Sequence, residues 1–214
     1  MQRPLTREEQ EWVERTLASM SLREKIGQTM QDHAGRLPFK GNDEEALAAY
    51  LKTYPVGSFF IGGEVIQKAA GKAEEYRDWA EQLQRISKYP LLFSGDLEFG
   101  AGSAVKSLTA FPPLLGLAAA DEEALAYEYG KFTALEGRAA GFTWALAPGT
   151  DLLLNRMNPV ITTRCLGDDA RRADRRAGAV RRGRHAHGLA AMANILPEEG
   201  GGSRTRSAGA PRTG

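Results

Sequence analysis

Two charged side chains stand where a parallel α/β fold places groups that contact a ligand. Asp96 lies just past the apolar, strand-like run 91–93, and Arg164 ends the segment 155–164 after a second apolar run. Because the carboxyl ends of parallel strands meet at one rim, both residues should lie in one site. A carboxylate can accept two hydrogen bonds from neighbouring hydroxyl groups, and a guanidinium offers several fixed donors. The two stretches therefore predict one binding site.

Each of these residues also has a structural interpretation. Asp96 could cap a turn, and Arg164 could form an ion pair with Asp151 that fixes a long loop. Asp151 could equally orient Arg164 or border the same pocket. Glu98 lies in the loop after Asp96, and we interpret it as a residue of the rim without a catalytic role. Cys165 should pack passively, as most free cysteines do.

Local signals predict the elements that must position these residues. Capping-box spacings begin helices at Thr6 and Ser21, and Asp43 begins a helix that ends before Pro55. Further helices are predicted over 65–87, from Asp121 to about 140, and from 168–169 towards 188. Buried-type strands are predicted over 56–61, 90–93, 142–147 and 189–193.

Strand and helix alternate in a way that indicates βα units and a parallel sheet. About five such units are present, whereas a closed barrel needs eight strands and typically about 250 residues. The predicted fold class is α/β, a partial (β/α)8 TIM barrel of about five units. We expect one incomplete barrel domain over residues 1–197 and a disordered tail over residues 198–214.

Composition supports one globular domain and excludes several classes. The chain has 214 residues, 42% of them hydrophobic, and a net charge of +1. Its single cysteine excludes an internal disulfide framework. No signal peptide or apolar run of about 20 residues is present, so we expect a cytoplasmic protein without a membrane partner.

The order of motifs resembles the N-terminal barrel domain of glycoside hydrolase family 3, the β-glucosidases and β-N-acetylglucosaminidases. The similarity is collinear from about Leu17 to about Pro197. It rests on a strand before Gly95-Asp96, then Phe111-Pro-Pro, a long helix, Ala147-Pro148, Asp151 and Asn158-Pro-Val-Ile-Thr-Thr-Arg164. The resemblance implies that Asp96 and Arg164 bind the non-reducing sugar of a β-linked glycoside, with Asp151 as a possible supporter. It implies hydrolysis of terminal β-linked glucose or N-acetylglucosamine.

Two departures from the family pattern lead us to expect an inactive chain. Family members usually carry Lys-His-Phe where this sequence has Asn194 and Ile195, and isoleucine cannot donate a hydrogen bond. The family's nucleophilic aspartate and general acid come from later segments, so no catalytic residue is assigned here. The alternative is a non-catalytic carbohydrate-binding or interaction protein on the same half-barrel. Because a shift of one base could restore Lys-His-Phe, a change of reading frame is a further hypothesis for the sequence after residue 193.

The arginine-rich end differs from the rest of the chain. Residues 171–214 carry a net charge of +7 and residues 1–170 carry −6. Arg172, Arg176, Val180 and Arg184 share one face of the predicted helix, so we expect this helix to dock poorly or to snorkel. A nucleic-acid surface is the alternative, but no aromatic interleaving or recognition motif accompanies it, and we expect no nucleic-acid partner.

No cofactor or metal is expected. His185 and His187 are two residues apart on a helix, which sends them to different faces, and His33 stands alone. An incomplete barrel leaves a strand edge exposed. We therefore expect possible self-association through that edge.

Overall fold

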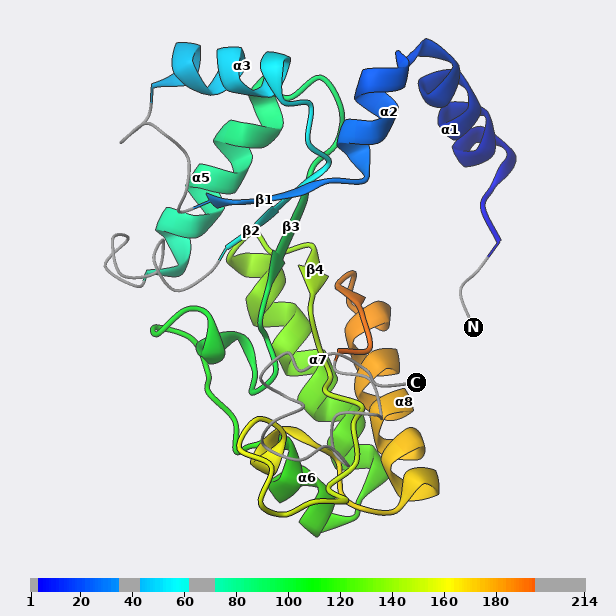
Figure 1. Cartoon of the computed structure of the whole chain (residues 1–214), viewed down its shortest axis with the longest axis vertical. Coiled ribbons are helices and arrows are strands. Elements are labelled where there is room, and N and C mark those ends of the chain that lie inside the picture. The colour runs from blue at the N-terminus through cyan, green and yellow to red at the C-terminus, as the bar shows by residue number, and fades with distance from the viewer. Residues whose placement is uncertain (1–3, 35–42, 62–71, 195–214) are drawn as a thin grey trace, which may run out of the picture.

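The structure is a computed structural model, and it describes residues 4–34, 43–61 and 72–194 (Figure 1). The predicted tail over 198–214, Ile195 and the first part of the helix predicted over 65–87 lie outside the described residues.

Strands and helices alternate along the described chain. The strands are β1 (Gln31–His33), β2 (Ser58–Phe60), β3 (Leu92–Gly95), β4 (Trp144–Ala145) and β5 (Ala190–Ala191). The helices are α1 (Arg7–Ser19), α2 (Leu22–Gln28), α3 (Glu44–Thr53), α5 (Ala73–Ile86), α6 (Leu114–Ala120), α7 (Glu123–Ala139) and α8 (Ala170–Ala186), with 3-10 turns η2 (Ala101–Ser103) and η3 (Thr162–Arg164).

The five strands form one parallel sheet in the order β1-β2-β3-β4-β5. All neighbouring pairs are parallel, for example Phe59 with Phe93 and Gly95 with Ala145. Helices α3, α5, α7 and α8 contact one another in chain order along the sheet (Figure 1). A sheet whose strands follow the chain in this way is the arrangement of an α/β barrel. The predicted fold class is confirmed.

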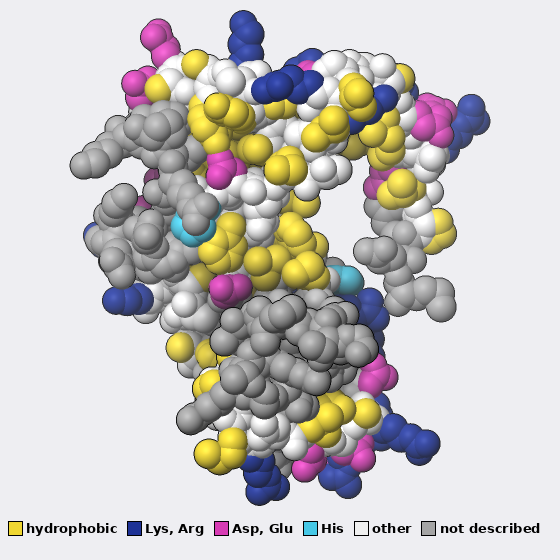
Figure 2. All heavy atoms as spheres, in the orientation of Figure 1, with side chains coloured by type: hydrophobic (Ala, Val, Ile, Leu, Met, Phe, Trp, Pro, Cys, Tyr) yellow, Lys and Arg dark blue, Asp and Glu magenta, His cyan; other side chains and the backbone are white. Residues whose placement is uncertain are grey.

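The two faces of the sheet differ. Phe59 and Phe93 pack edge-to-face on Trp79 of α5, so they face the helices and belong to the main core. Leu92 precedes Phe93 and therefore points to the other face, where 47% of its surface is exposed. On that face Gln31 of β1 reaches across β2 to donate to the Ser94 hydroxyl at 2.8 Å. Figure 2 shows hydrophobic side chains in the middle of this view, over the strands.

Local capping was predicted well. Both capping boxes form, with Thr6 and Glu9 bonding each other's backbone at the start of α1, and Ser21 and Glu24 doing so at the start of α2. Asp43 caps α3 as predicted. Helix α1 stands apart from the sheet in Figure 1, and none of its residues is buried.

Two elements differ from the prediction. Helix α6 was not predicted, and Asp121 is the left-handed residue that ends it instead of the cap of α7. Strand β1 was not predicted because its residues, Gln31, Asp32 and His33, are all polar. In both places the tertiary surroundings, and not the local sequence signal, decide the conformation.

The prediction that the arginine-rich helix docks poorly is wrong. Helix α8 packs closely on α7: a Cβ atom on Gly130 would lie 2.1 Å from the Val180 carbonyl oxygen, and one on Gly183 would lie 2.2 Å from that of Tyr127. Arg176 and Arg184 of α8 are both buried. They are accommodated because acceptors from distant segments meet them. Arg176 donates to Asp121 and to the Leu166 carbonyl, and Arg184 donates to the Leu97 carbonyl.

Within the described ranges, no helix combines the length and the apolar character that crossing a bilayer requires.

Candidate functional site

The chain leaves β3 through a tightly constrained turn that presents Asp96. Gly95 ends the strand, and a Cβ atom there would lie 2.5 Å from the ring of Phe142, so only glycine fits this close approach. Leu97 is then fully buried, whereas Asp96 remains exposed at the carboxyl end of the strand. The buried Leu97 side chain therefore fixes this turn in the core, while Asp96 stays accessible to solvent.

Glu98, interpreted from the sequence as a rim residue, is instead buried and bound to Arg164. Its two carboxylate oxygens accept from Arg164 Nη2 at 2.7 Å and from Nε at 2.9 Å, a two-point ion pair. The side chain of Glu98 is 7% exposed and that of Arg164 33%. Such a pair fixes the plane of a guanidinium as well as its position. Glu98 thus determines where Arg164 lies.

Asp96 belongs to the same electrostatic cluster. Although part of its side chain reaches solvent, burial among surrounding atoms raises the pKa of Asp96, and the neighbouring Glu98 carboxylate raises it further. The Arg164 guanidinium acts in the opposite direction and lowers that pKa. Because Arg164 binds Glu98, which follows Asp96 by two residues, the structure places Arg164 next to the turn that carries Asp96.

Arg164 is held by a loop that is ordered by a buried asparagine. The side-chain oxygen of Asn158 accepts from the backbone N–H groups of Val160 at 2.9 Å and Ile161 at 3.3 Å. Asn158 is 1% exposed, so the turn into η3 is fixed from inside. Cys165 follows Arg164 and is buried, as expected for passive packing.

Asp151 and Asn194 lie deeper than Asp96. Asp151 is 1% exposed, and one of its oxygens accepts from the backbone N–H of Leu152 at 2.7 Å. This burial leaves almost none of the Asp151 side chain accessible to a ligand. The amide nitrogen of Asn194 donates to the Leu146 carbonyl at 3.1 Å, and its backbone forms a bridge with Gly149. The side chain of Asn194 therefore ties the ends of β4 and β5 together.

Sequence reasoning missed three residues that shape this site. Besides Glu98, they are Tyr129 of α7 and Arg184 of α8, which lie beneath the turn after β3. The hydroxyl of Tyr129 lies 3.1 Å from the carbonyl oxygens of both Glu98 and Pro112 and shares its proton between them. The spacing Asp96-Leu97-Glu98 could have predicted a nearby cation. Two carboxylates on either side of a buried leucine repel each other unless a positive charge lies close to them. Nothing local indicated Tyr129 or Arg184.

The groups of this cluster differ in how far they can be reached by a ligand. Asp96 is an accessible acceptor, and Arg164, which is bound to Glu98, is a partly exposed donor. Glu98 is occupied by Arg164, and Asp151 is buried, so neither offers an accessible second carboxyl group. In the part of the chain that the structure describes, no three metal-ligating side chains gather in one place.

Comparison with known proteins agrees with this architecture. Residues 21–212 match the family described as the Glycosyl hydrolase family 3 N terminal domain. A beta-N-acetylglucosaminidase/beta-glucosidase from Cellulomonas fimi is 31% identical over 189 residues, which cover 88% of this chain and 31% of that protein.

Solved structures show the same fold. Beta-glucoside phosphorylase BglX bound to 2FGlc superposes with a TM-score of 0.77 at 30% identity, covering 92% of this chain and 34% of that one. A family 3 beta-N-acetylglucosaminidase from Paenibacillus sp. str. FPU-7 gives 0.75 at 27% identity, covering 86% and 35%. The chain thus spans about a third of the length of these relatives. On the strength of the matched family and the shared fold, the chain belongs to glycosyl hydrolase family 3, through the N-terminal domain of that family.

Proposed function

We propose that this chain binds the terminal sugar of β-linked glucosides or N-acetylglucosaminides at the carboxyl end of its sheet. Asp96 accepts hydrogen bonds from neighbouring sugar hydroxyls, Arg164 donates to the sugar, and Asp151 supports the loop between them. In family 3 this binding serves glycoside hydrolysis.

The observation that carries the proposal is the cluster of Asp96, Glu98 and Arg164. An exposed carboxylate and a guanidinium with a fixed plane lie together at the strand ends, where parallel α/β folds bind ligands. The printed names of the relatives support the ligand class, since they include a beta-glucosidase and a protein bound to 2FGlc.

We further propose that the 214-residue polypeptide alone does not cleave glycosides. A retaining mechanism needs two carboxyl groups about 5 Å apart on the two sides of the scissile bond. Of the described carboxyl groups in the cluster, Asp96 is accessible, whereas Glu98 is bound to Arg164. Binding without turnover is therefore the expected behaviour of this chain.

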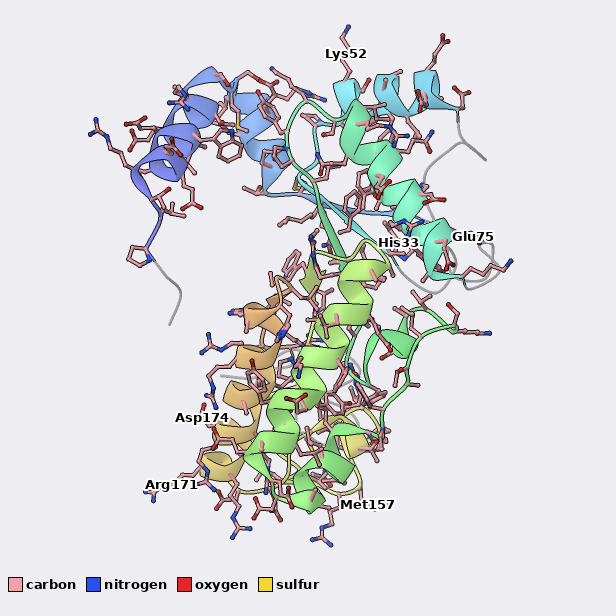
Figure 3. All side chains as sticks on the ribbon, turned by 180° about the vertical axis from the view of Figure 1, so that it is seen from behind. His33, Lys52, Glu75, Met157, Arg171 and Asp174 are labelled. Carbon is pink, nitrogen blue, oxygen red and sulfur yellow. The ribbon has the colours of Figure 1, made fainter. Side chains whose placement is uncertain are left out.

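Calorimetry with glucose and with N-acetylglucosamine tests the binding site. Replacing Asp96 with Ala should weaken binding about 10- to 100-fold, because hydrogen bonds to a charged group are worth about 1.5–3 kcal/mol. Asp174→Ala is the matched control, since Asp174 lies on the outer side of α8 (Figure 3). Equal affinities in wild type and Asp96→Ala, or no binding of either sugar by the wild type, would refute the proposed site.

A chromogenic aryl β-glycoside tests turnover. The purified chain should release no chromophore above the buffer rate, whereas robust release would contradict the proposed absence of a catalytic pair. Sugar binding measured by calorimetry, together with no release of chromophore in this assay, would support a carbohydrate-binding role for the chain.

A further inference from the structure

Arg184 is the largest fully buried side chain among the described residues. It comes from α8 and reaches under the turn that follows β3, where its Nη2 atom donates to the Leu97 carbonyl at 2.9 Å. These residues are 87 positions apart in the chain, so the contact joins the last described helix to the candidate site.

Leu97 lies between Asp96 and Glu98 in the chain, so a donor on its carbonyl constrains the backbone from which both carboxylates extend. On the next residue, the Tyr129 hydroxyl lies 3.1 Å from the Glu98 carbonyl oxygen and shares its proton between this oxygen and the Pro112 carbonyl, also at 3.1 Å. Arg184 also interacts electrostatically with Glu98, the residue that binds Arg164. The turn is thus contacted by α7 through Tyr129 and by α8 through the buried guanidinium of Arg184.

This buried guanidinium is costly for the fold. Its Nε and Nη1 atoms have no hydrogen-bond partner among the described residues. Burial lowers the pKa of Arg184 to about 10, with Tyr129 and Glu98 opposing that change. In the described parts of the chain, no carboxylate lies within salt-bridge distance of Arg184, so an apolar side chain of similar length would avoid the desolvation of a charge without breaking such a pair. Stability alone therefore does not account for an arginine here.

We propose that Arg184 is a positioning residue for the sugar site: from beneath the turn it fixes the Leu97 carbonyl and the Glu98 carboxylate, and thereby sets the geometry of Asp96 and Arg164. The inference rests on the proposed sugar binding. It makes α8, which touches no ligand, a determinant of affinity.

Arg176 provides a matched control on the same helix. It is also buried and also donates to a main-chain carbonyl, that of Leu166 at 2.9 Å, but its partner carboxylate is Asp121 and not Glu98. We would compare Arg184→Met with Arg176→Met in the full chain by three measurements. These are the urea midpoint, the Nε–H resonance of Arg164 in ligand-free protein, and calorimetric binding of glucose and N-acetylglucosamine.

The expected result separates positioning from stability. Arg184→Met should unfold at the same or higher urea concentration than wild type, yet lose the distinct Arg164 resonance and bind sugar at least tenfold more weakly. Arg176→Met should keep the resonance and an affinity within about threefold of wild type. A retained resonance and affinity in Arg184→Met would overturn the proposal.

Two further comparisons keep the test decisive if a variant does not fold or if no sugar binds. If the methionine variants do not fold, lysine variants at both positions replace them. Lysine keeps the positive charge but lacks the planar guanidinium group with its several donors. We therefore expect Arg184→Lys to lower sugar affinity about threefold and Arg176→Lys to leave it unchanged. Equal affinities of the two lysine variants would overturn the proposal. If wild type binds neither sugar, the proposed function fails, while the Arg164 resonance in ligand-free protein still decides the role of Arg184.

Discussion

Glu98 and Arg164 are 66 residues apart in the chain, and their side chains meet in a two-point ion pair at 2.7 and 2.9 Å. The pair joins the turn after β3 to the loop before α8, so it determines the distance between the two parts of the candidate site. Removing the buried partner leaves the guanidinium uncompensated.

We predict that Glu98→Gln lowers the free energy of unfolding by about 2 kcal/mol, less than the loss for a fully buried pair because Arg164 is one-third exposed. Sugar affinity should fall about tenfold because Arg164 loses its fixed plane. Urea denaturation and calorimetry measure the two effects. A double-mutant cycle combines Glu98→Gln with Arg164→Gln. The losses of unfolding free energy in the two single variants should differ from additivity by at least about 1 kcal/mol, and additive losses would contradict a direct pair.

The raised pKa of Asp96 predicts a pH dependence of binding. The ionised carboxylate accepts from sugar hydroxyls more strongly than the protonated acid does, so affinity is full above the pKa of Asp96 and falls towards a weaker plateau below it. Burial, and then Glu98, raise that pKa above the ordinary 3.8, so the loss should begin at a correspondingly higher pH. Calorimetry across pH measures the midpoint. Asp96→Asn should bind weakly with no such midpoint, and a midpoint at or below 3.8 would contradict the electrostatic cluster.

The contact between α7 and α8 predicts opposite effects for two glycines of one helix. A Cβ atom at Gly183 would lie 2.2 Å from the Tyr127 carbonyl oxygen and 2.8 Å from the Lys131 nitrogen, so Gly183→Ala should cost about 2 kcal/mol of stability. At Gly178 the nearest atom is the end of the flexible Arg182 side chain at 3.3 Å. Gly178→Ala should therefore stabilise the protein by about 0.5–1 kcal/mol through helix propensity. Thermal unfolding of both variants checks the pair, and equal effects would disprove the close approach.

Local rules predicted much of this fold. The caps at Thr6, Ser21 and Asp43 formed as expected because each depends on residues within one helical turn. Short apolar runs in the sequence predicted the strands near 58–60 and 92–95, and most residues of both strands are buried in the structure. Asp96 and Arg164 were nominated through their positions after such runs.

What the sequence did not reveal depends on long-range partners. Asp121 reads as a helix cap, yet it ends α6 and binds Arg176, which lies 55 residues later. The helical spacing of Arg176 and Arg184 predicted a basic face that docks poorly. In the structure both are buried, because acceptors on distant segments bind them. Glu98 read as a rim residue because its partner comes from another loop. Charges that are neutralised across the fold cannot be assigned from spacing within one helix.

The open face of the sheet predicts self-association. In the described part of the chain, β1 and β5 each pair with a single neighbouring strand, and Leu92 of the central strand is 47% exposed on the face away from α5. We expect the mass measured by light scattering to rise with concentration, and Leu92→Lys should reduce that rise because a charge opposes burial of this face. Leu125 on α7 is equally exposed, at 47%, so Leu125→Lys is the matched control and should behave like wild type. A constant monomer mass, or the same reduction in both variants, would show that this face does not carry the association.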